Sequence, residues 1–223
     1  MDILAAIRKR KSIRGYKPDP VPREILREII EIAERAPSAM NTQPWEITVV
    51  TGKILDNIKQ SQIELLKAGA TPKVKIPSKP FAGKYRQRQI DLAIQIFKLM
   101  GIAREDKDKR AEWMEHGYRF FDAPVAIILT VDRSIDRTYS QFDVGAISQT
   151  ICLAAMEYGL GTCIEDQGIA FSAVVRKHAQ IPESKRVVTG IAIGYPDWDF
   201  PANKLESRRE PLEEFVSWHG FTR

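Results

Sequence analysis

The sequence predicts an α+β fold. Helical and strand patterns intermix along the chain, without the regular alternation that is typical of a doubly wound parallel sheet. Residues 125–131 form a continuous apolar run, as expected of a strand buried on both faces. The 223 residues contain no internal repeat and no linker long enough to separate two domains. We therefore expect a single domain over residues 1–223.

Each element follows from a local pattern. Asp2 can cap a first helix whose apolar residues share one face. Pro22 suits the first turn of a second helix, which Pro37 ends. A loop at 38–44 then leads into a strand rich in β-branched residues at 46–51. Further helices are expected at 53–68, 87–101, 107–120, 141–158 and 171–179, and further strands at 125–131, 162–165 and 187–195.

Two stretches fit no regular element. Residues 69–86 mix prolines and glycines with many lysines, which predicts a mobile surface excursion. From Pro196 onward the chain is rich in proline and charge and then carries Phe215, Trp218 and Phe221. Because this segment is too apolar for a free end, we expect it to pack on another surface, such as a second subunit.

Composition and charge exclude several classes of protein. The 34 basic and 29 acidic side chains are interspersed, so the net charge of +5 makes a poor nucleic-acid binder but can attract an anionic ligand. No apolar run approaches the ~18 residues of a membrane span. The N-terminus lacks the long apolar core of a signal peptide. We therefore expect a cytoplasmic protein that binds neither nucleic acid nor a membrane.

Cysteine and histidine patterns argue against a metal site. Cys152 and Cys163 lie in apolar surroundings and without C-x-x-C spacing, which favours two buried, reduced thiols. The three histidines are scattered along the chain. We expect no metal.

The block from Arg10 to Arg14 is the first candidate for chemistry. In an extended chain alternate side chains point the same way, so Arg10, Ser12 and Arg14 would converge. Two guanidinium groups and a hydroxyl make a good phosphate clamp, because arginine offers forked donors and stays charged. A solvated basic segment after a helix is the alternative.

Two further stretches carry suitable groups. The loop from Ala36 to Trp45 holds Ser38, Asn41 and Gln43, whose polar side chains can bond the edge of a heterocycle. Residues 159–166 combine a helix stop, a short strand and acidic residues, and their backbone amides can face a flat ligand. Either stretch, taken alone, can equally be a structural turn.

Taken together, these motifs are more specific. Arg-x-Ser-x-Arg near residue 10, Ala-Pro-Ser-x-x-Asn-x-Gln-Pro-Trp, Gly-Leu-Gly-Thr and Arg-Arg-x-Pro-Leu occur here in one order. In that combination the chain resembles the FMN-dependent nitroreductase family over essentially its whole length. The ending at 213–221 is similar to the branch that contains bacterial nitroaromatic reductases.

The resemblance implies a homodimer with two FMN sites at the subunit interface. Its fold would have a central mixed, mainly antiparallel sheet flanked by helices, and a C-terminal tail that extends onto the partner. One subunit would bind FMN through its phosphate clamp and through a turn whose backbone amide lies near flavin N5, and the partner would add its 37–43 loop. Carried over by motif, the residues are Arg10, Lys11, Ser12, Arg14, Ile164, Glu165, Asp166, Arg208 and Arg209 of one chain, with Pro37, Ser38, Ala39, Met40, Asn41 and Gln43 of the other.

The same resemblance implies an oxidoreductase. NADH or NADPH would reduce flavin N5 by hydride transfer, and a nitroaromatic, a quinone or a similar electron-poor compound would be reduced in a ping-pong cycle. No catalytic side chain is expected. The alternatives are reductive dehalogenation or another specialised reaction on the same fold, then an FMN-binding protein without catalysis, or a nucleic-acid module that uses the basic loop at 69–88.

Substrate choice would belong to a variable lid at about 69–121. Its aromatic and basic side chains could stack on a substrate or contact an anion, although each could instead cover the dimer surface. The candidates are Tyr85, Arg86, Arg88, Tyr118, Phe120 and Phe121.

Overall fold

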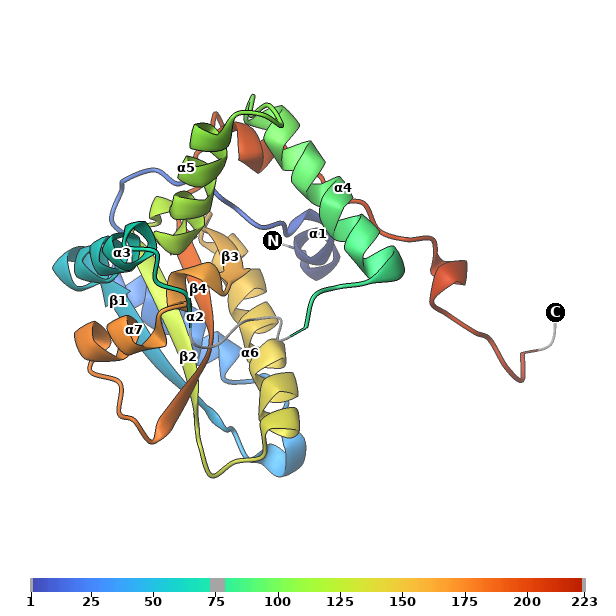
Figure 1. Ribbon diagram of the computed structural model, residues 1–223. Coiled ribbons are helices and arrows are strands. Elements are labelled where there is room, and N and C mark those ends of the chain that lie inside the picture. The colour runs from blue at the N-terminus through green and yellow to red at the C-terminus, as the bar shows by residue number, and fades with distance from the viewer. Residues whose placement is uncertain (1, 73–78, 222–223) are drawn as a thin grey trace.

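A four-stranded sheet forms the centre of the protein, with the strand order β1-β2-β4-β3 (Figure 1). The computed structural model describes residues 2–72 and 79–221. The strands are β1 (Trp45–Thr51), β2 (Val125–Asp132), β3 (Gly161–Glu165) and β4 (Lys185–Gly194). Every neighbouring pair is antiparallel. An isolated bridge between Ser12 and Thr162 adds one parallel contact at the β3 edge. The predicted α+β class, with a mixed and mainly antiparallel sheet, is confirmed.

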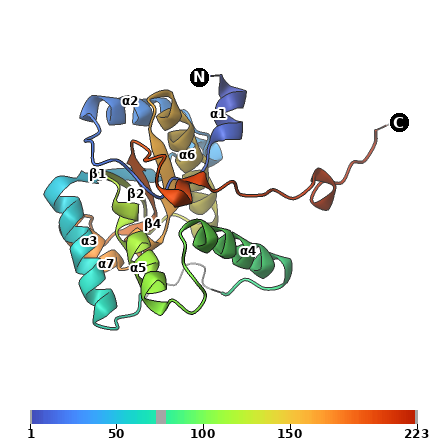
Figure 2. The ribbon, with the colours of Figure 1, turned by 90° about the horizontal axis from the view of Figure 1, so that it is seen from above.

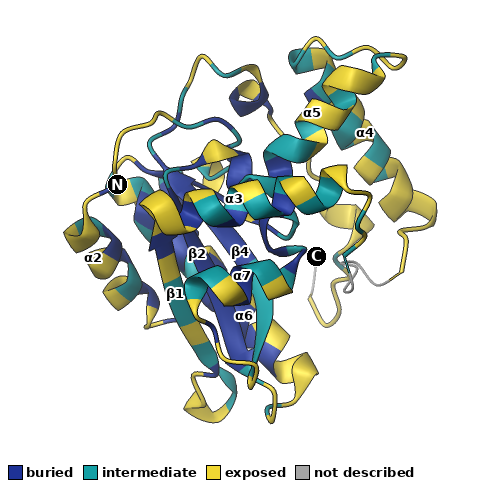
Figure 3. Cartoon of the chain, turned by 60° about the vertical axis from the view of Figure 1, so that its left-hand side comes forward, coloured by how far each residue is buried: buried dark blue, intermediate teal, exposed yellow. Residues whose placement is uncertain are grey.

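Helices cover both faces of the sheet, so its central strands are buried on both sides (Figure 3). The α2 (Arg23–Ala33) and α6 (Arg137–Glu157) helices pack on one face, and α3 (Gly52–Lys67) and α7 (Ser172–Ala179) on the other. Successive residues of β2 alternate between the two layers, because side chains on a strand point to opposite faces. Val125, Ile127 and Leu129 join the α6 core, whereas Ala126 and Ile128 join the α3 core.

Three segments lie at the periphery. In α1 (Ile3–Lys9), the Asp2 carboxylate accepts a hydrogen bond from the Ala5 amide at 3.0 Å, as the predicted cap requires. The α4 helix (Gly83–Leu99) stands away from the sheet beside α5 (Lys107–Tyr118). Figure 2 shows the C-terminal segment passing α4 and leaving the body of the molecule. Large apolar side chains are exposed on α1 and along this tail: Ile3, Leu4, Ile7, Leu212, Phe215, Trp218 and Phe221.

The predicted helices and strands are all present, with shifted ends. The α6 helix begins four residues before the predicted start at 141, because the Asp136 carboxylate accepts hydrogen bonds from the Thr138 and Tyr139 amides. The α4 helix begins at Gly83 and so replaces the end of the excursion predicted at 69–86. Residues 73–78 of that excursion lie outside the described residues. Within the described part of the chain, no helix combines the length and apolarity that a bilayer crossing requires.

Candidate functional site

The Arg10–Arg14 block runs in an extended conformation beside the edge strand β3. The Ile13 amide donates a hydrogen bond to the Thr162 carbonyl at 2.9 Å, and Ile13 itself is buried. This close approach explains a glycine of the Gly-Leu-Gly-Thr motif, because a Cβ atom at Gly161 would lie 2.5 Å from Ile13 Cγ1. Since alternate side chains of an extended segment point to opposite sides, burial of Ile13 turns Ser12 and Arg14 away from the core beneath it.

Long-range hydrogen bonds fix the backbone of Arg14. Its amide donates to Asn203 Oδ1 at 2.7 Å, and its carbonyl lies 2.8 Å from His116 Nε2. Asn203 is fully buried and also donates to the carbonyls of Gly15 and Asp197. The Arg14 guanidinium lies 5.9 Å from the centre of the Phe121 ring. The backbone is therefore held from two sides, while the half-buried guanidinium makes, among the described residues, one long hydrogen bond, to the Ser12 carbonyl.

The other end of the block carries three positively charged side chains. Lys9, Arg10 and Lys11 line a cavity of about 310 Å³ together with the Gly-Leu-Gly-Thr turn and Trp198. Lys11 Nζ donates to the Leu205 carbonyl at 3.4 Å and lies 5.9 Å from the centre of the Trp198 ring. These contacts tie the basic block to the start of the C-terminal segment.

Arg208 and Arg209, the predicted arginine pair of the C-terminal segment, lie near the Arg10–Arg14 block without contacting Arg10 among the described residues. Arg208 follows Leu205 by three residues, a reach of at most about 10 Å along the backbone. The Arg209 guanidinium instead bonds the carbonyl and hydroxyl of Ser207. No contact among the described residues joins either arginine to Arg10.

The 37–43 loop, which is predicted to contact the flavin bound by the partner, does not lie beside the Arg10–Arg14 block of its own chain. The Ala39 amide donates to Asp143 Oδ1 at 3.2 Å, and the Gln43 amide donates to Ser38 Oγ at 2.9 Å. Met40, Asn41 and Gln43 have φ between 46° and 59°, a left-handed conformation that non-glycine residues seldom adopt. Met40 is 99% exposed. The loop is therefore anchored through Asp143 and Ser38 and presents its central residues to solvent.

Within one chain, this loop and the Arg10–Arg14 block are far apart (Figure 1). The loop is held at Asp143, near the start of α6, whereas the cavity beside Arg10 includes Met156 at the other end of that helix. Thirteen residues of helix separate these two positions, which corresponds to about 20 Å at 1.5 Å per residue. One chain alone does not bring the two candidate sets together.

The turn at 164–166 places its three side chains differently. Ile164 is 39% exposed, on the opposite side of the strand from Glu165. The Glu165 carboxylate is buried, where Oε2 accepts a hydrogen bond from the Gly168 amide at 2.8 Å and Oε1 has no partner among the described residues. Burial raises the pKa of Glu165 to about 8. It also raises the pKa of Asp166, which accepts a hydrogen bond from Thr189. Ile164 is thus the exposed side chain of this turn, whereas Glu165 is buried and Asp166 is half-buried.

The residues predicted to contact a substrate fall into separate groups. Tyr85 and Arg86 lie near the start of α4, and their neighbour Arg88 forms an ion pair with Glu210 of the C-terminal segment at 3.0 Å. Tyr118 ends α5, packs near Phe171 and lines a different cavity. Phe120 and Phe121 are buried in the core, with positive φ values of 55° and 53°. Neither phenylalanine has a ring surface available to a ligand, so the candidate contacts reduce to the other residues.

Sequence patterns alone did not single out three residues that build the site. Asn203, His116 and Asp143 each fix a candidate segment by contacting it from a distant part of the chain. His116 also contacts Asp122 through Nδ1 at 3.0 Å. The separations in sequence run from 102 to 189 residues, and no local motif surrounds these side chains. Only an alignment of related sequences could have drawn attention to them.

Comparison with known proteins gives a consistent result. The Nitroreductase family profile matches residues 7–195. The chain is 34% identical to a 4-nitrobenzoate reductase of Pseudomonas putida, over 100% of this chain and 97% of the relative. It is also 34% identical to a nitrobenzene nitroreductase of Ectopseudomonas oleovorans, over 95% of this chain and 94% of the relative.

Solved structures of nitroreductases share the fold of this chain. The FMN and NADPH-dependent nitroreductase NfnB from sphigopyxis sp. strain HMH superposes with a TM-score of 0.93 at 31% identity, covering 99% of this chain and 100% of that one. The FMN-dependent nitroreductase NfnB from Mycobacterium smegmatis, in complex with NADPH, has a TM-score of 0.89 at 27% identity, covering 99% and 97%. The family match, the full-length similarity and the shared fold together show that this chain belongs to the nitroreductase family.

Proposed function

We propose that the protein is an FMN-dependent NAD(P)H oxidoreductase that reduces nitroaromatic compounds, and that it works as a homodimer in the cytoplasm. The observation that carries the proposal is the cationic Arg10–Arg14 block, which is held along β3 beside the turn at 164–166, where Ile164 is exposed. The relatives described above are FMN-dependent or are nitroaromatic reductases, and several match over the whole chain.

The residues present fit FMN. The cavity beside Arg10 offers three cationic side chains to a phosphate, and Arg208 or Arg209 is within reach of it through the C-terminal segment. Ser12 and Arg14 would bind the ribityl chain and the pyrimidine edge. The exposed face of Ile164 and the backbone of Glu165 and Asp166 would lie against the isoalloxazine. The buried carboxylate of Glu165 would make no contact with it.

The protein's part in the reaction is binding, orientation and charge. Bound FMN would supply the redox chemistry, hydride transfer from NADH or NADPH and electron transfer to the oxidant. Arg14 would stabilise the negative charge that develops on the pyrimidine edge, since its backbone is fixed by Asn203 and His116 before any ligand arrives. No side chain of this chain is assigned as a catalytic acid or base.

A second copy of the chain would complete the site. The 37–43 loop and the Arg10–Arg14 block lie beside opposite ends of α6, so a twofold axis across the middle of that helix would place the loop of one copy beside the block of the other. Tyr139 and Phe142 on α6 are exposed, Phe142 by 77%, as are the apolar residues of α1 and the tail. A partner that covers these surfaces would remove their exposed apolar side chains from water.

The substrate we propose is a nitroaromatic compound, with 4-nitrobenzoate as the first to test because of the similarity to 4-nitrobenzoate reductase. The lid at about 69–121 would supply substrate contacts through Tyr85, Arg86 and Tyr118. Reductive dehalogenation is not favoured. The similarity to iodotyrosine deiodinase, with a TM-score of 0.67 at 24% identity, concerns the fold alone.

The test is a visible absorption spectrum of the purified protein, recorded before and after anaerobic addition of NADPH or NADH. We expect an oxidised flavin spectrum that bleaches with the reductant and returns when 4-nitrobenzoate is added. Return of colour with iodotyrosine but not with nitroaromatics would assign a different oxidant. A protein that stays colourless after incubation with FMN would contradict the proposal.

A further inference from the structure

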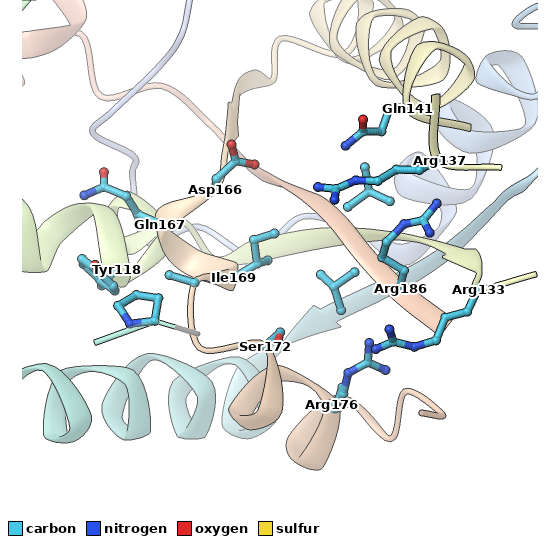
Figure 4. Close-up of a pocket in the computed structure, with 14 residues that line it drawn as sticks. Tyr118, Arg133, Arg137, Gln141, Asp166, Gln167, Ile169, Ser172, Arg176 and Arg186 are labelled. Atoms are coloured by element: carbon cyan, nitrogen blue, oxygen red, sulfur yellow. The ribbon is translucent and has the colours of Figure 1, made fainter. Parts of the chain in front are cut away.

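Beyond the end of β3 lies a second cavity, of about 580 Å³, that shares no lining residue with the one beside Arg10 (Figure 4). It exists because β3 ends at Glu165, opposite Gly190, while β4 continues back to Lys185. Among the described residues, a strand therefore pairs with residues 185–189 of β4 on one side only. Residues at the start of α6 and in the segment from Gln167 to Arg176 line the cavity at this open edge.

Four arginines from four different segments line this cavity. Figure 4 shows their side chains gathered at one end of it, whereas Tyr118, Asp166 and Gln167 lie at the other end. Asp166 is the one carboxylate in the described lining, and its Oδ1 atom accepts a hydrogen bond from Thr189. The four arginines are Arg133, Arg137, Arg176 and Arg186.

Two of these guanidinium groups have donors without acceptors. Arg137 makes no side-chain hydrogen bond or ion pair with any described residue. Arg186 donates through Nη2 to Ser140 Oγ at 2.9 Å, but its Nε is buried and has no hydrogen-bond partner among the described residues. By contrast, Arg176 donates hydrogen bonds to the carbonyls of Pro182 and Lys185. It therefore contributes positive charge to the cavity rather than free hydrogen-bond donors. A buried donor that lacks an acceptor costs free energy, which a bound anion would recover.

The local charges also favour an anion. Burial lowers the pKa of Arg186, and so does the positive charge of Arg137 and Arg133. The carboxylates near the arginines are engaged or exposed: Asp136 caps α6, and Glu183 lies 4.0 Å from Arg176 in a strongly solvated position. Guanidinium groups that repel one another across a cavity are stabilised by an oxyanion placed between them.

We propose that this cavity binds a small organic anion, whose carboxylate or phosphate group is held by Arg137 and Arg186. The apolar body of the ligand would extend toward Ile169 and Val188. The volume is within the usual range of small-molecule pockets, roughly 300–1,000 Å³. The proposal does not rest on the proposed oxidoreductase activity.

The experiment is calorimetric titration of FMN-saturated protein with benzoate and, separately, with inorganic phosphate. Saturation with FMN fills the phosphate clamp at Arg10, so that phosphate binding there does not interfere. We expect saturable binding of at least one probe and a loss of affinity of about tenfold or more in Arg137→Gln, the effect of removing a charge-assisted bond. The probe that binds more tightly identifies the oxyanion.

A matched control is Arg27→Gln, which removes another exposed positive charge, from α2. It should bind the probe as the unaltered protein does. Arg137 is exposed, and its substitution leaves the Asp136 cap in place, so the variant should fold and keep its FMN. Absence of binding to the unaltered protein would overturn the proposal. Equal weakening by Arg27→Gln, or weakening by Arg10→Gln but not by Arg137→Gln, would also overturn it.

Discussion

Asn203 accepts a hydrogen bond from the backbone amide of Arg14 at 2.7 Å, across 189 residues of sequence. The same buried side chain donates to the carbonyls of Gly15 and Asp197. One amide group thus joins the basic block to the segment that leads into the C-terminal tail. The block is held in its extended form by this contact and by β3, rather than by anything in its own sequence.

Asn203→Ala should therefore damage both stability and cofactor binding. It removes three hydrogen bonds and leaves the Arg14 amide without a partner among the described residues, whereas the Gly15 and Asp197 carbonyls still accept from the Asp197 and Phe200 amides. We expect the free energy of unfolding to fall by about 2–4 kcal/mol. FMN should dissociate more readily, because Arg14 is no longer fixed. Denaturant unfolding and FMN titration measure the two effects. Asn57→Ala on α3 is the control and should change the unfolding free energy by less than about 0.5 kcal/mol.

The phosphate clamp can be tested by Arg10→Ala and Arg209→Ala. Each should weaken FMN retention by more than about 1.5 kcal/mol, roughly tenfold, since a charge-assisted hydrogen bond to phosphate is lost. Ultrafiltration with fluorescence detection of free FMN gives the dissociation constant. Arg27→Ala, on the outer surface of α2, should leave it unchanged. Full retention in both clamp variants would mean that the phosphate binds elsewhere.

Glu165 should make the protein less stable as the pH rises. Its pKa is about 8 in the folded protein against an ordinary value of 4.5, because burial disfavours the carboxylate. Between these two values the folded state holds the proton more tightly than the unfolded state does. The stabilisation is complete below pH 4.5 and is lost as the pH passes through 8, with a slope of at most about 1.4 kcal/mol per pH unit.

Thermal unfolding of Glu165→Gln from pH 5 to pH 9 checks this prediction. Glutamine keeps the shape without the titration, so its melting temperature should fall less across this range than that of the unaltered protein. Glu34→Gln, an exposed residue next to α2, should keep the original slope. Identical slopes in the unaltered protein and in Glu165→Gln would show that Glu165 does not titrate as proposed.

The dimer can be tested on the exposed face of α6. Phe142→Glu places a charge on an apolar surface that a partner would bury, so we expect a monomer and a loss of bound FMN. Analytical ultracentrifugation and the flavin-to-protein absorbance ratio report the two outcomes. Ile54→Glu changes an exposed apolar residue on α3, away from this face, and should stay dimeric. A monomeric unaltered protein that retains FMN would contradict the shared site.

Local sequence determined the elements and the chemistry that they carry. The Asp2 cap, the apolar run of β2 and the amphipathic helices depend on residues a few positions apart, so their patterns predicted the α+β class and nearly every helix and strand. The Arg10–Arg14 block and the Ala36–Trp45 loop were found in the same way, as compact motifs.

Tertiary structure decided where those motifs lie and which groups stay unpaired. It brought Asn203 into hydrogen-bond contact with Arg14 and buried Phe121 and Glu165. It also placed the 37–43 loop and the basic block beside opposite ends of α6. It also gathered Arg137 and Arg186 at one cavity, although 48 residues lie between them in the sequence. The physical reason is that periodicity and capping act over one or two turns of chain, whereas burial and hydrogen-bond partners depend on segments that only the folded sheet brings together.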